Sequence, residues 1–157
     1  MITEVKAPDN YNFSDIFLAG SIENDNAERW QDRFVNNITE YFSDKDVGEL
    51  VITNPRRDIW PGNDDKEELE KQINWELNAL ASSFYIAMYF DKNTTSPITL
   101  LELGLNASDR LYVCCPEEYF RYENVRITCE KYGVHFFTTE VEWRSALFKE
   151  IEDYYCV

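Results

Sequence analysis

Residues 84–90, FYIAMYF, are the longest wholly apolar run in the chain. Both alternating faces of this run are apolar, which is typical of a parallel strand covered by helices on both sides. A strand with one solvent-exposed face would alternate apolar and polar residues instead. We therefore expect residues 84–90 to form the middle of a parallel sheet.

Strand-like and helix-like segments alternate on either side of this run. Four further apolar segments predict strands, at residues 15–20, 50–53, 111–115 and 134–137. Helical spacing, acidic first turns and capping residues predict helices at residues 27–42, from 64, from 97, at 125–132 and at 139–154. We therefore expect one α/β domain over residues 1–157, a single three-layer flavodoxin-like (Rossmann-like) domain with a five-stranded, mostly parallel sheet.

Two of these helices carry more detailed signals. In the helix that starts near residue 64, the spacing of Ile73, Leu77 and Leu80 predicts a buried face. In the helix that starts near residue 97, Ser96 is expected to be the N-cap and Pro97 the first helical residue, where the missing amide costs nothing.

The charge of the chain restricts its partners. Thirty acidic residues against 15 basic ones give a formal net charge of −15. Such a charge repels nucleic-acid backbones and anionic membrane surfaces, so long nucleic acid and membranes are not expected partners. A small anionic or neutral ligand remains compatible with the composition, because a local pocket can differ in charge from the whole surface.

Cysteine usage and the N-terminal residues indicate a cytoplasmic protein. The four cysteines show no Cys-x-x-Cys spacing, so we expect reduced thiols and neither a metal site nor a cofactor held by them. Residues 1–12 contain charged and proline residues where a signal peptide needs an apolar stretch. The longest apolar run is too short to cross a membrane.

Ligands of open parallel sheets bind beyond the carboxyl ends of the strands, so the loops after each strand were considered together. These loops and the helices that follow them contain the candidates for chemistry. They are Gly20, Ser21, Ile22, Arg56, Arg57, Trp60, the segment from Asp91 to Pro97 with the helix that follows it, and Cys115 with Pro116.

Glu102 lies on the helix from Pro97, beside an apolar stripe formed by Ile98, Leu101 and Leu105. If that stripe faces the core, the carboxylate is partly desolvated at the edge of a ligand crevice. The alternative is an exposed glutamate whose stem packs along the helix edge. Periodicity leaves both interpretations open.

The other charged candidates have equally simple alternatives. Glu76 is either a surface charge or part of a site, and Asp91 either contacts a ligand or caps the turn after the central strand. Arg56 and Arg57 suit a carboxylate or phosphate, but they equally suit pairing with some of the many acids. The indole of Trp60 can stack on a nucleobase.

Taken together, the segments from Ile16 to Gly133 resemble the nucleoside 2-deoxyribosyltransferases and their relatives. Residues 17–22, FLAGSI, resemble the opening strand and glycine turn of that family, and residues 96–104, SPITLLELG, resemble its nucleophile helix. Residues 54–57, NPRR, and the pair at 75–76, WE, match the branch described as deoxyribosyltransferase-like. The order of these segments is specific to the family, although each segment alone is a weak signal.

The resemblance implies a role for each matching residue. Glu102 matches the nucleophile that forms a glycosyl ester, Glu76 an acid that manages protons on the base, and Asp91 an aspartate that orients the nucleophile or sugar. Asn124 matches an asparagine that a neighbouring subunit contributes to the sugar, which implies a homo-oligomer. The implied reaction transfers a 2-deoxyribosyl group from a nucleoside to a free nucleobase, without a metal or organic cofactor.

Three alternatives remain at this point. If water attacks the ester, the protein is a nucleoside N-glycosidase. Ser21 departs from the proline common in the transferases and resembles the Gly-Ser-Ile turn of the related nucleotide hydrolases, so with Arg56 or Arg57 nearby a 5′-monophosphate is an alternative substrate. A non-catalytic protein that binds or sequesters nucleotides is the third alternative.

Overall fold

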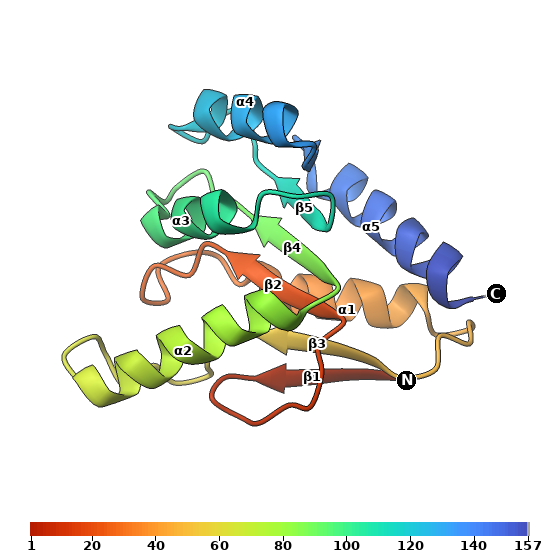
Figure 1. The fold of residues 1–157 in the computed structure, drawn as a ribbon, viewed down its shortest axis with the longest axis horizontal. Coiled ribbons are helices and arrows are strands. Elements are labelled where there is room, and N and C mark those ends of the chain that lie inside the picture. The colour runs from red at the N-terminus through yellow and green to blue at the C-terminus, as the bar shows by residue number, and fades with distance from the viewer. Residues whose placement is uncertain (157) are drawn as a thin grey trace.

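The computed structural model describes residues 1–156, which form a sheet with helices on both faces (Figure 1). The strands are β1 (Ile2–Lys6), β2 (Ile16–Gly20), β3 (Leu50–Asn54), β4 (Tyr85–Tyr89), β5 (Leu111–Cys114) and β6 (His135–Phe137). The helices are α1 (Trp30–Tyr41), α2 (Lys66–Ser82), α3 (Pro97–Asn106), α4 (Tyr122–Tyr132) and α5 (Glu140–Tyr155).

The sheet has six strands in the order β1-β3-β2-β4-β5-β6, and every pairing is parallel. Without β1, the order corresponds to the 2-1-3-4-5 arrangement of flavodoxin-like domains. The predicted architecture and the interior position of β4 are therefore confirmed, but the predicted number of five strands is wrong. The missed strand, β1, pairs only with β3 at the sheet edge, and its half-exposed residues, of which only Ile2 and Val5 are apolar, carry no strong apolar signal.

Each face of the sheet has its own apolar core. Side chains from alternate positions of β4 go to opposite cores, Ala87 and Tyr89 to one, Ile86 and Met88 to the other. The first core is closed by α1 and α5, and the second by α2, α3 and α4, as the ribbon in Figure 1 shows. Both faces of β4 are thus apolar because helices cover both faces of the sheet, as predicted.

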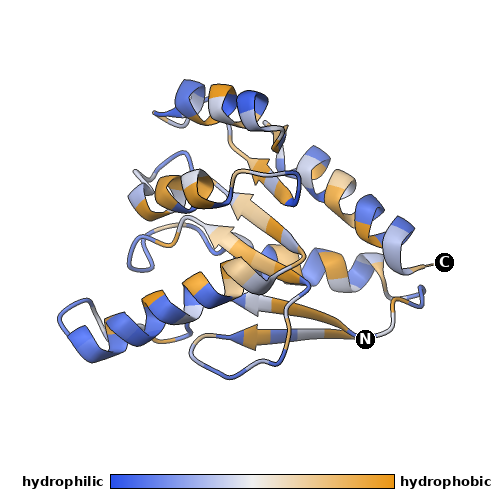
Figure 2. Ribbon diagram, viewed as in Figure 1, coloured by the Kyte–Doolittle hydropathy of each residue, from blue (hydrophilic) through white to orange (hydrophobic). Residues whose placement is uncertain are grey.

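Five of the six residues in the apolar stripes of α2 and α3 face outwards and not into the core. Ile73 and Leu77 of α2 and Ile98, Leu101 and Leu105 of α3 have between 45% and 62% of their surface exposed. Figure 2 shows these helices with orange apolar bands on the side turned to the viewer. The third residue of the face predicted for α2, Leu80, is buried as expected, and the two helices also bury Gln72, Ala79, Thr99, Glu102 and Leu103.

The carboxyl ends of β2 and β4 create the position for a ligand site. These two strands are neighbours, yet the helix after β2 covers one face of the sheet and the helix after β4 covers the other. At such a reversal the two outgoing loops separate and leave a crevice above the strand ends.

Within residues 1–156, no helix has both the length and the apolar composition needed to cross a membrane. The four cysteines, including the exposed Cys156, are free thiols.

Candidate active site

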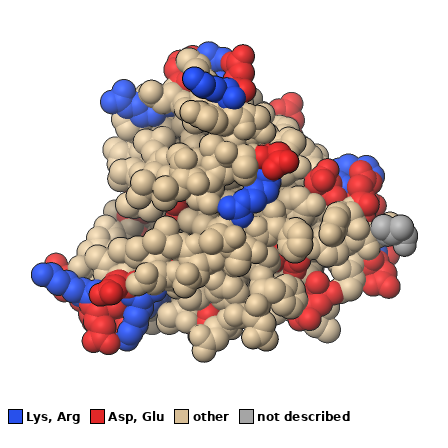
Figure 3. Space-filling model, in the orientation of Figure 1, with Lys and Arg blue, Asp and Glu red and all other residues tan. Residues whose placement is uncertain are grey.

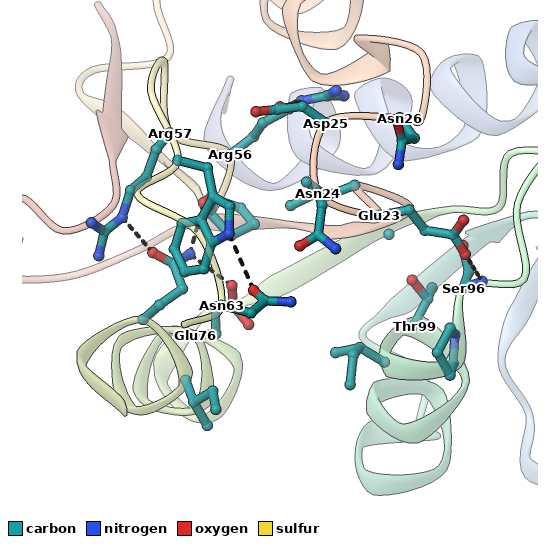
Figure 4. Close-up of a pocket in the computed structure, with 18 of the residues that line it drawn as sticks. Glu23, Asn24, Asp25, Asn26, Arg56, Arg57, Asn63, Glu76, Ser96 and Thr99 are labelled. Atoms are coloured by element: carbon teal, nitrogen blue, oxygen red, sulfur yellow. Dashed lines mark hydrogen bonds and ion pairs between the residues drawn. The ribbon is translucent and has the colours of Figure 1, made fainter. Parts of the chain in front are cut away.

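A cleft of about 610 Å³ opens at the carboxyl ends of β2, β3 and β4. Its walls are the loop after β2, the loop after β3, one side of α2 and the first turns of α3 (Figure 4). Figure 3 shows acidic atoms at the bottom of a hollow between α2 and α3. The cleft is therefore at the place where the sheet topology predicts a ligand.

Glu102 projects from α3 into this cleft and is only 7% exposed. Among residues 1–156 no group donates a hydrogen bond to its carboxylate, and its oxygens are not sealed from solvent. Burial, with a smaller contribution from the charge of Glu76, raises the pKa of Glu102 to about 8. Of the two interpretations left open for Glu102, the structure shows the desolvated carboxylate, although the apolar stripe beside it is exposed and does not face the core.

Glu76 reaches the same cleft from α2. Burial raises the pKa of Glu76 to about 7, although a hydrogen bond from Gln72 and the charge of Arg57 act in the opposite direction. The structure thus brings two of the three predicted catalytic carboxyl groups together, Glu76 and Glu102. Their mutual repulsion in a poorly solvated cleft favours a state in which the pair keeps one proton at neutral pH.

The first turn of α3 is built differently from its prediction. Pro97 is the first helical residue as expected, but Ser96 adopts a left-handed conformation (φ 47°) and its side chain caps nothing. The Ser96 hydroxyl contacts the hydroxyl groups of Ser21 and Thr94 instead. The backbone amide of Ser96 donates to the carboxylate of Glu23, which therefore occupies the positive end of α3.

The loop after β2 has an unusual backbone. Glu23, Asn24 and Asp25 all have positive φ angles of 45°, 54° and 69°, a conformation that is costly outside glycine. Arg56 holds this loop with its whole guanidinium group and is only 2% exposed. Its hydrogen-bond acceptors are the carboxylate of Asp25, the carbonyls of Ala27 and Glu28, and the side chain of Gln31.

Asp91 does not reach the cleft of Glu76 and Glu102. It lines a separate pocket of about 280 Å³, and its carboxylate accepts hydrogen bonds from the amides of Glu28 and Asn93. Its position after β4 thus caps the turn, which was one of the two alternatives for this residue. Asp91 was expected to converge with the other two carboxyl groups, and the structure contradicts that expectation.

Gly20 and Ile22 line the cleft as expected, whereas Ser21 between them does not. Ser21 is 1% exposed, and its hydroxyl accepts a hydrogen bond from the amide of Asp91. It therefore links the loop after β2 to the loop after β4 outside the cleft and has no free surface for a phosphate group.

Arg57 and Trp60 both line the cleft, and the guanidinium carbon of Arg57 lies 5.3 Å from the centre of the Trp60 ring. The indole of Trp60 is partly exposed and donates to Asn63 at 3.1 Å. Asn124 lies on the exposed side of α4 and is not part of the cleft. A contribution from Asn124 would therefore have to come from another copy of the chain.

Two cleft residues with clear roles were missed by sequence reasoning, Glu23 and Gln72. Glu23 opens a run of polar residues directly after β2, and Asn and Asp in such a run are prone to left-handed conformations. Gln72 stands four residues before Glu76 on a helix, a spacing at which side chains meet. No group of three or more His, Cys, Asp or Glu side chains in residues 1–156 is arranged to hold a metal ion.

Comparison with protein families agrees with this geometry. The profile of the family described as nucleoside 2-deoxyribosyltransferase-like matches residues 14–119, about two thirds of the chain. The chain belongs to this family. None of the curated proteins compared with the chain matches it. The match to the deoxyribosyltransferase-like family includes every residue that lines the cleft, and it leaves out β1, α4, β6 and α5.

Proposed function

We propose that the protein cleaves the N-glycosidic bond of a nucleoside in the cleft and transfers the sugar, a 2-deoxyribosyl group, to another nucleobase. The observation that carries this proposal is the buried carboxylate of Glu102, which faces the cleft without a hydrogen-bond donor and has Glu76 beside it. Buried carboxylates are usually satisfied by donors, so an unsatisfied one in a cleft favours a role in chemistry.

The proposed reaction has two displacements at the anomeric carbon of the sugar. In the first, the Glu102 carboxylate forms a bond to this carbon, the bond to the base breaks, and Glu76 gives a proton to the departing base. In the second, a new base attacks the ester, its proton passes to Glu76, and Glu102 regains its carboxylate. Two inversions give overall retention, and water in place of the second base gives hydrolysis.

This use of two carboxyl groups predicts a bell-shaped dependence of kcat/KM on pH. The pair must lose one proton to supply the nucleophile and keep one to supply the acid, so both limbs report the coupled pair. From the pKa values of about 7 for Glu76 and about 8 for Glu102, we expect a narrow maximum between these values. A rate profile that stays flat from about pH 5 to about pH 10 would contradict this use of the pair.

The charges around the cleft favour a nucleoside over its 5′-monophosphate. The positive end of α3, where a phosphate group would otherwise bind, is occupied by the carboxylate of Glu23. The guanidinium group of Arg56 is already satisfied by protein acceptors, and Ser21 is buried. A phosphate group would therefore meet the carboxylates of the cleft, and the cleft cation that keeps a donor without a partner, Arg57 through its Nη2, is already paired with Glu68.

A panel of ribonucleosides, deoxyribonucleosides and their monophosphates, each incubated with and without free bases and separated by chromatography, tests the proposal. Base exchange that requires an added base supports transfer, and release of free base at a comparable rate in water alone supports the N-glycosidase. We expect nucleosides to react faster than monophosphates. If no glycosidic bond breaks under any condition while ligands still bind, the protein is a nucleotide-binding protein and the enzymatic proposal is wrong.

We also propose that copies of the chain associate through the exposed apolar stripe of α3, formed by Ile98, Leu101 and Leu105. In Figure 3 the face that carries α2 and α3 is largely free of charged side chains despite the net charge of −15: apart from basic and acidic atoms near its middle, they lie at its margins. An apolar surface of this kind on a strongly charged protein favours contact with a second copy. Since Ile98 also lines the cleft, such an interface would lie beside the site.

Leu101→Glu is expected to lower the molecular mass in solution, because it places a charge in the middle of the proposed interface and does not touch the core. Leu101 is 56% exposed, so the fold should keep its thermal stability. Light scattering coupled to gel filtration measures the mass, and Ile127→Glu on α4 is a matched control at a residue that is 53% exposed outside this stripe. Equal masses for the wild type and Leu101→Glu would exclude this interface.

A further inference from the structure

A chain of hydrogen bonds leads from Glu76 into the wall of the cleft (Figure 4). Gln72 Nε2 donates to Glu76 Oε1 at 2.7 Å and to the carbonyl of Pro55 at 2.8 Å. Arg57 Nε donates to Gln72 Oε1, also at 2.7 Å. Because Gln72 is only 6% exposed and the side chain of Arg57 only 9%, water cannot readily replace these bonds.

The orientation of the Gln72 amide follows from its three partners. A guanidinium group only donates hydrogen bonds, so the amide atom that faces Arg57 must be the oxygen. The carbonyl of Pro55 only accepts, so the amide atom that faces it must be the nitrogen. A flipped amide would place donor against donor at Arg57 and acceptor against acceptor at Pro55. The N–H group that faces Glu76 is therefore a donor in every state of the site.

A fixed donor restricts where Glu76 can carry a proton. Glu76 Oε1 lies 2.7 Å from Gln72 Nε2 and must accept, because a proton on this oxygen pointing at the amide would meet the amide hydrogen. We propose that Gln72 is a positioning residue that holds Glu76 Oε1 as an acceptor and so confines the proton that Glu76 exchanges with the ligand to Oε2. This inference rests on the proposed function, in which Glu76 is the proton carrier.

Arg57 is the outer end of this hydrogen-bond chain. Its Nη1 donates to Glu68 at 2.8 Å, and its guanidinium group lies over the ring of Trp60. The chain therefore extends from the one large aromatic surface of the cleft loop to the proton carrier. The positive guanidinium group of Arg57 lies next to the Gln72 oxygen and polarises the amide. This polarisation strengthens the hydrogen bond that the amide donates to Glu76.

Gln72→Met tests this inference, because methionine keeps the length and volume of the side chain but has no amide donor. Asn74→Met is the matched control, since it introduces the same side chain at an exposed amide of the same helix. The carboxyl titration of Glu76 is followed by ¹³C NMR in the ligand-free protein with labelled glutamate. The signal of Glu76 is assigned as the one that is missing from the spectrum of the Glu76→Gln variant.

We expect the Glu76 titration midpoint to rise by about one pH unit in Gln72→Met, because a hydrogen bond that favours the charged form is lost. The acidic limb of the kcat/KM profile should move to higher pH in the same variant. Asn74→Met should change neither. Gln72→Leu, which also lacks the amide donor, should move the Glu76 midpoint in the same direction and provides a second variant if Gln72→Met does not fold.

An unchanged Glu76 midpoint in folded Gln72→Met, or equal changes in Gln72→Met and Asn74→Met, would overturn the role of Gln72. This readout needs no substrate. If the wild type turns over no nucleoside, the proposed function fails, while the titration still decides whether Gln72 controls Glu76. If turnover is normal and the midpoint does not move, the proposed function stands and the role of Gln72 is wrong.

Discussion

Glu102→Gln is expected to lower nucleoside turnover by a factor on the order of 10⁴ or more, because an amide cannot form the glycosyl ester. The substitution changes almost no volume, so the cleft keeps its shape and should still bind nucleoside. Chromatography of the reaction products measures the loss. Mass spectrometry of acid-quenched wild-type protein should find the mass of the sugar on the peptide that contains Glu102, and should not find it in the variant.

The same substitution should stabilise the fold at alkaline pH. Burial raises the pKa of Glu102 from an ordinary value of 4.5 to about 8, so between these values the folded protein holds a proton that the unfolded chain has lost. The contribution of Glu102 to the free energy of unfolding therefore falls as pH rises through this window. In Glu102→Gln the free energy of unfolding does not decrease in this way. Since each pKa unit corresponds to about 1.4 kcal/mol, the variant should be a few kcal/mol more stable than the wild type above pH 8.

Loss of activity together with a gain in stability separates a functional carboxylate from a structural one. A structural glutamate would lose stability on substitution, and urea denaturation at acidic and alkaline pH measures the difference. Glu70→Gln makes the same chemical change at an exposed position of α2 and should alter neither property. Turnover by Glu102→Gln within about tenfold of the wild type would exclude Glu102 as the nucleophile.

The fold could be predicted from the sequence to the extent that each strand had two apolar faces. Strand β4 and its neighbours follow this pattern, and their helices were predicted with them. Strand β1 could not be found in this way, because a half-exposed edge strand has no continuous apolar run. Ile73 and Leu77 of α2 were expected to be buried but are exposed, and the side of the α3 stripe could not be assigned, since periodicity identifies an apolar face but not what it packs against.

The sequence predicted which carboxyl groups meet in the candidate site, but not the hydrogen bonds that hold the surrounding residues in place. Glu76 and Glu102 meet in one cleft because their helices border the same crevice. Asp91 and Arg56 stand at the same edge of the sheet, but neighbouring amides and carbonyls already satisfy them. Whether a charged residue in a loop is free for a ligand depends on hydrogen bonds made across the chain, which a linear pattern does not contain.

Gly20→Ala is expected to destabilise the protein by about 3 kcal/mol or more, because it combines a backbone clash with a disfavoured backbone angle. A Cβ at Gly20 would lie 2.3 Å from the carbonyl oxygen of Tyr89 and 2.8 Å from its nitrogen, and φ is +141°. Both neighbours are backbone atoms of β4, the strand next to β2, so the sheet itself must shift to make room. The carbonyl of Tyr89 also accepts a hydrogen bond from the amide of Ser21, so a shift of this carbonyl would also displace the loop after β2 that borders the cleft.

Gly104→Ala is the matched control for this prediction, and its expected effect has the opposite sign. Gly104 lies within α3 with no atom within 4 Å of an added Cβ, so alanine should stabilise the helix by about 0.5–1 kcal/mol. Thermal denaturation of both variants measures the contrast. If Gly20→Ala were as stable as Gly104→Ala, the close approach of β2 and β4 at the mouth of the cleft would be wrong, and with it the position of the loop that carries Glu23 to the start of α3.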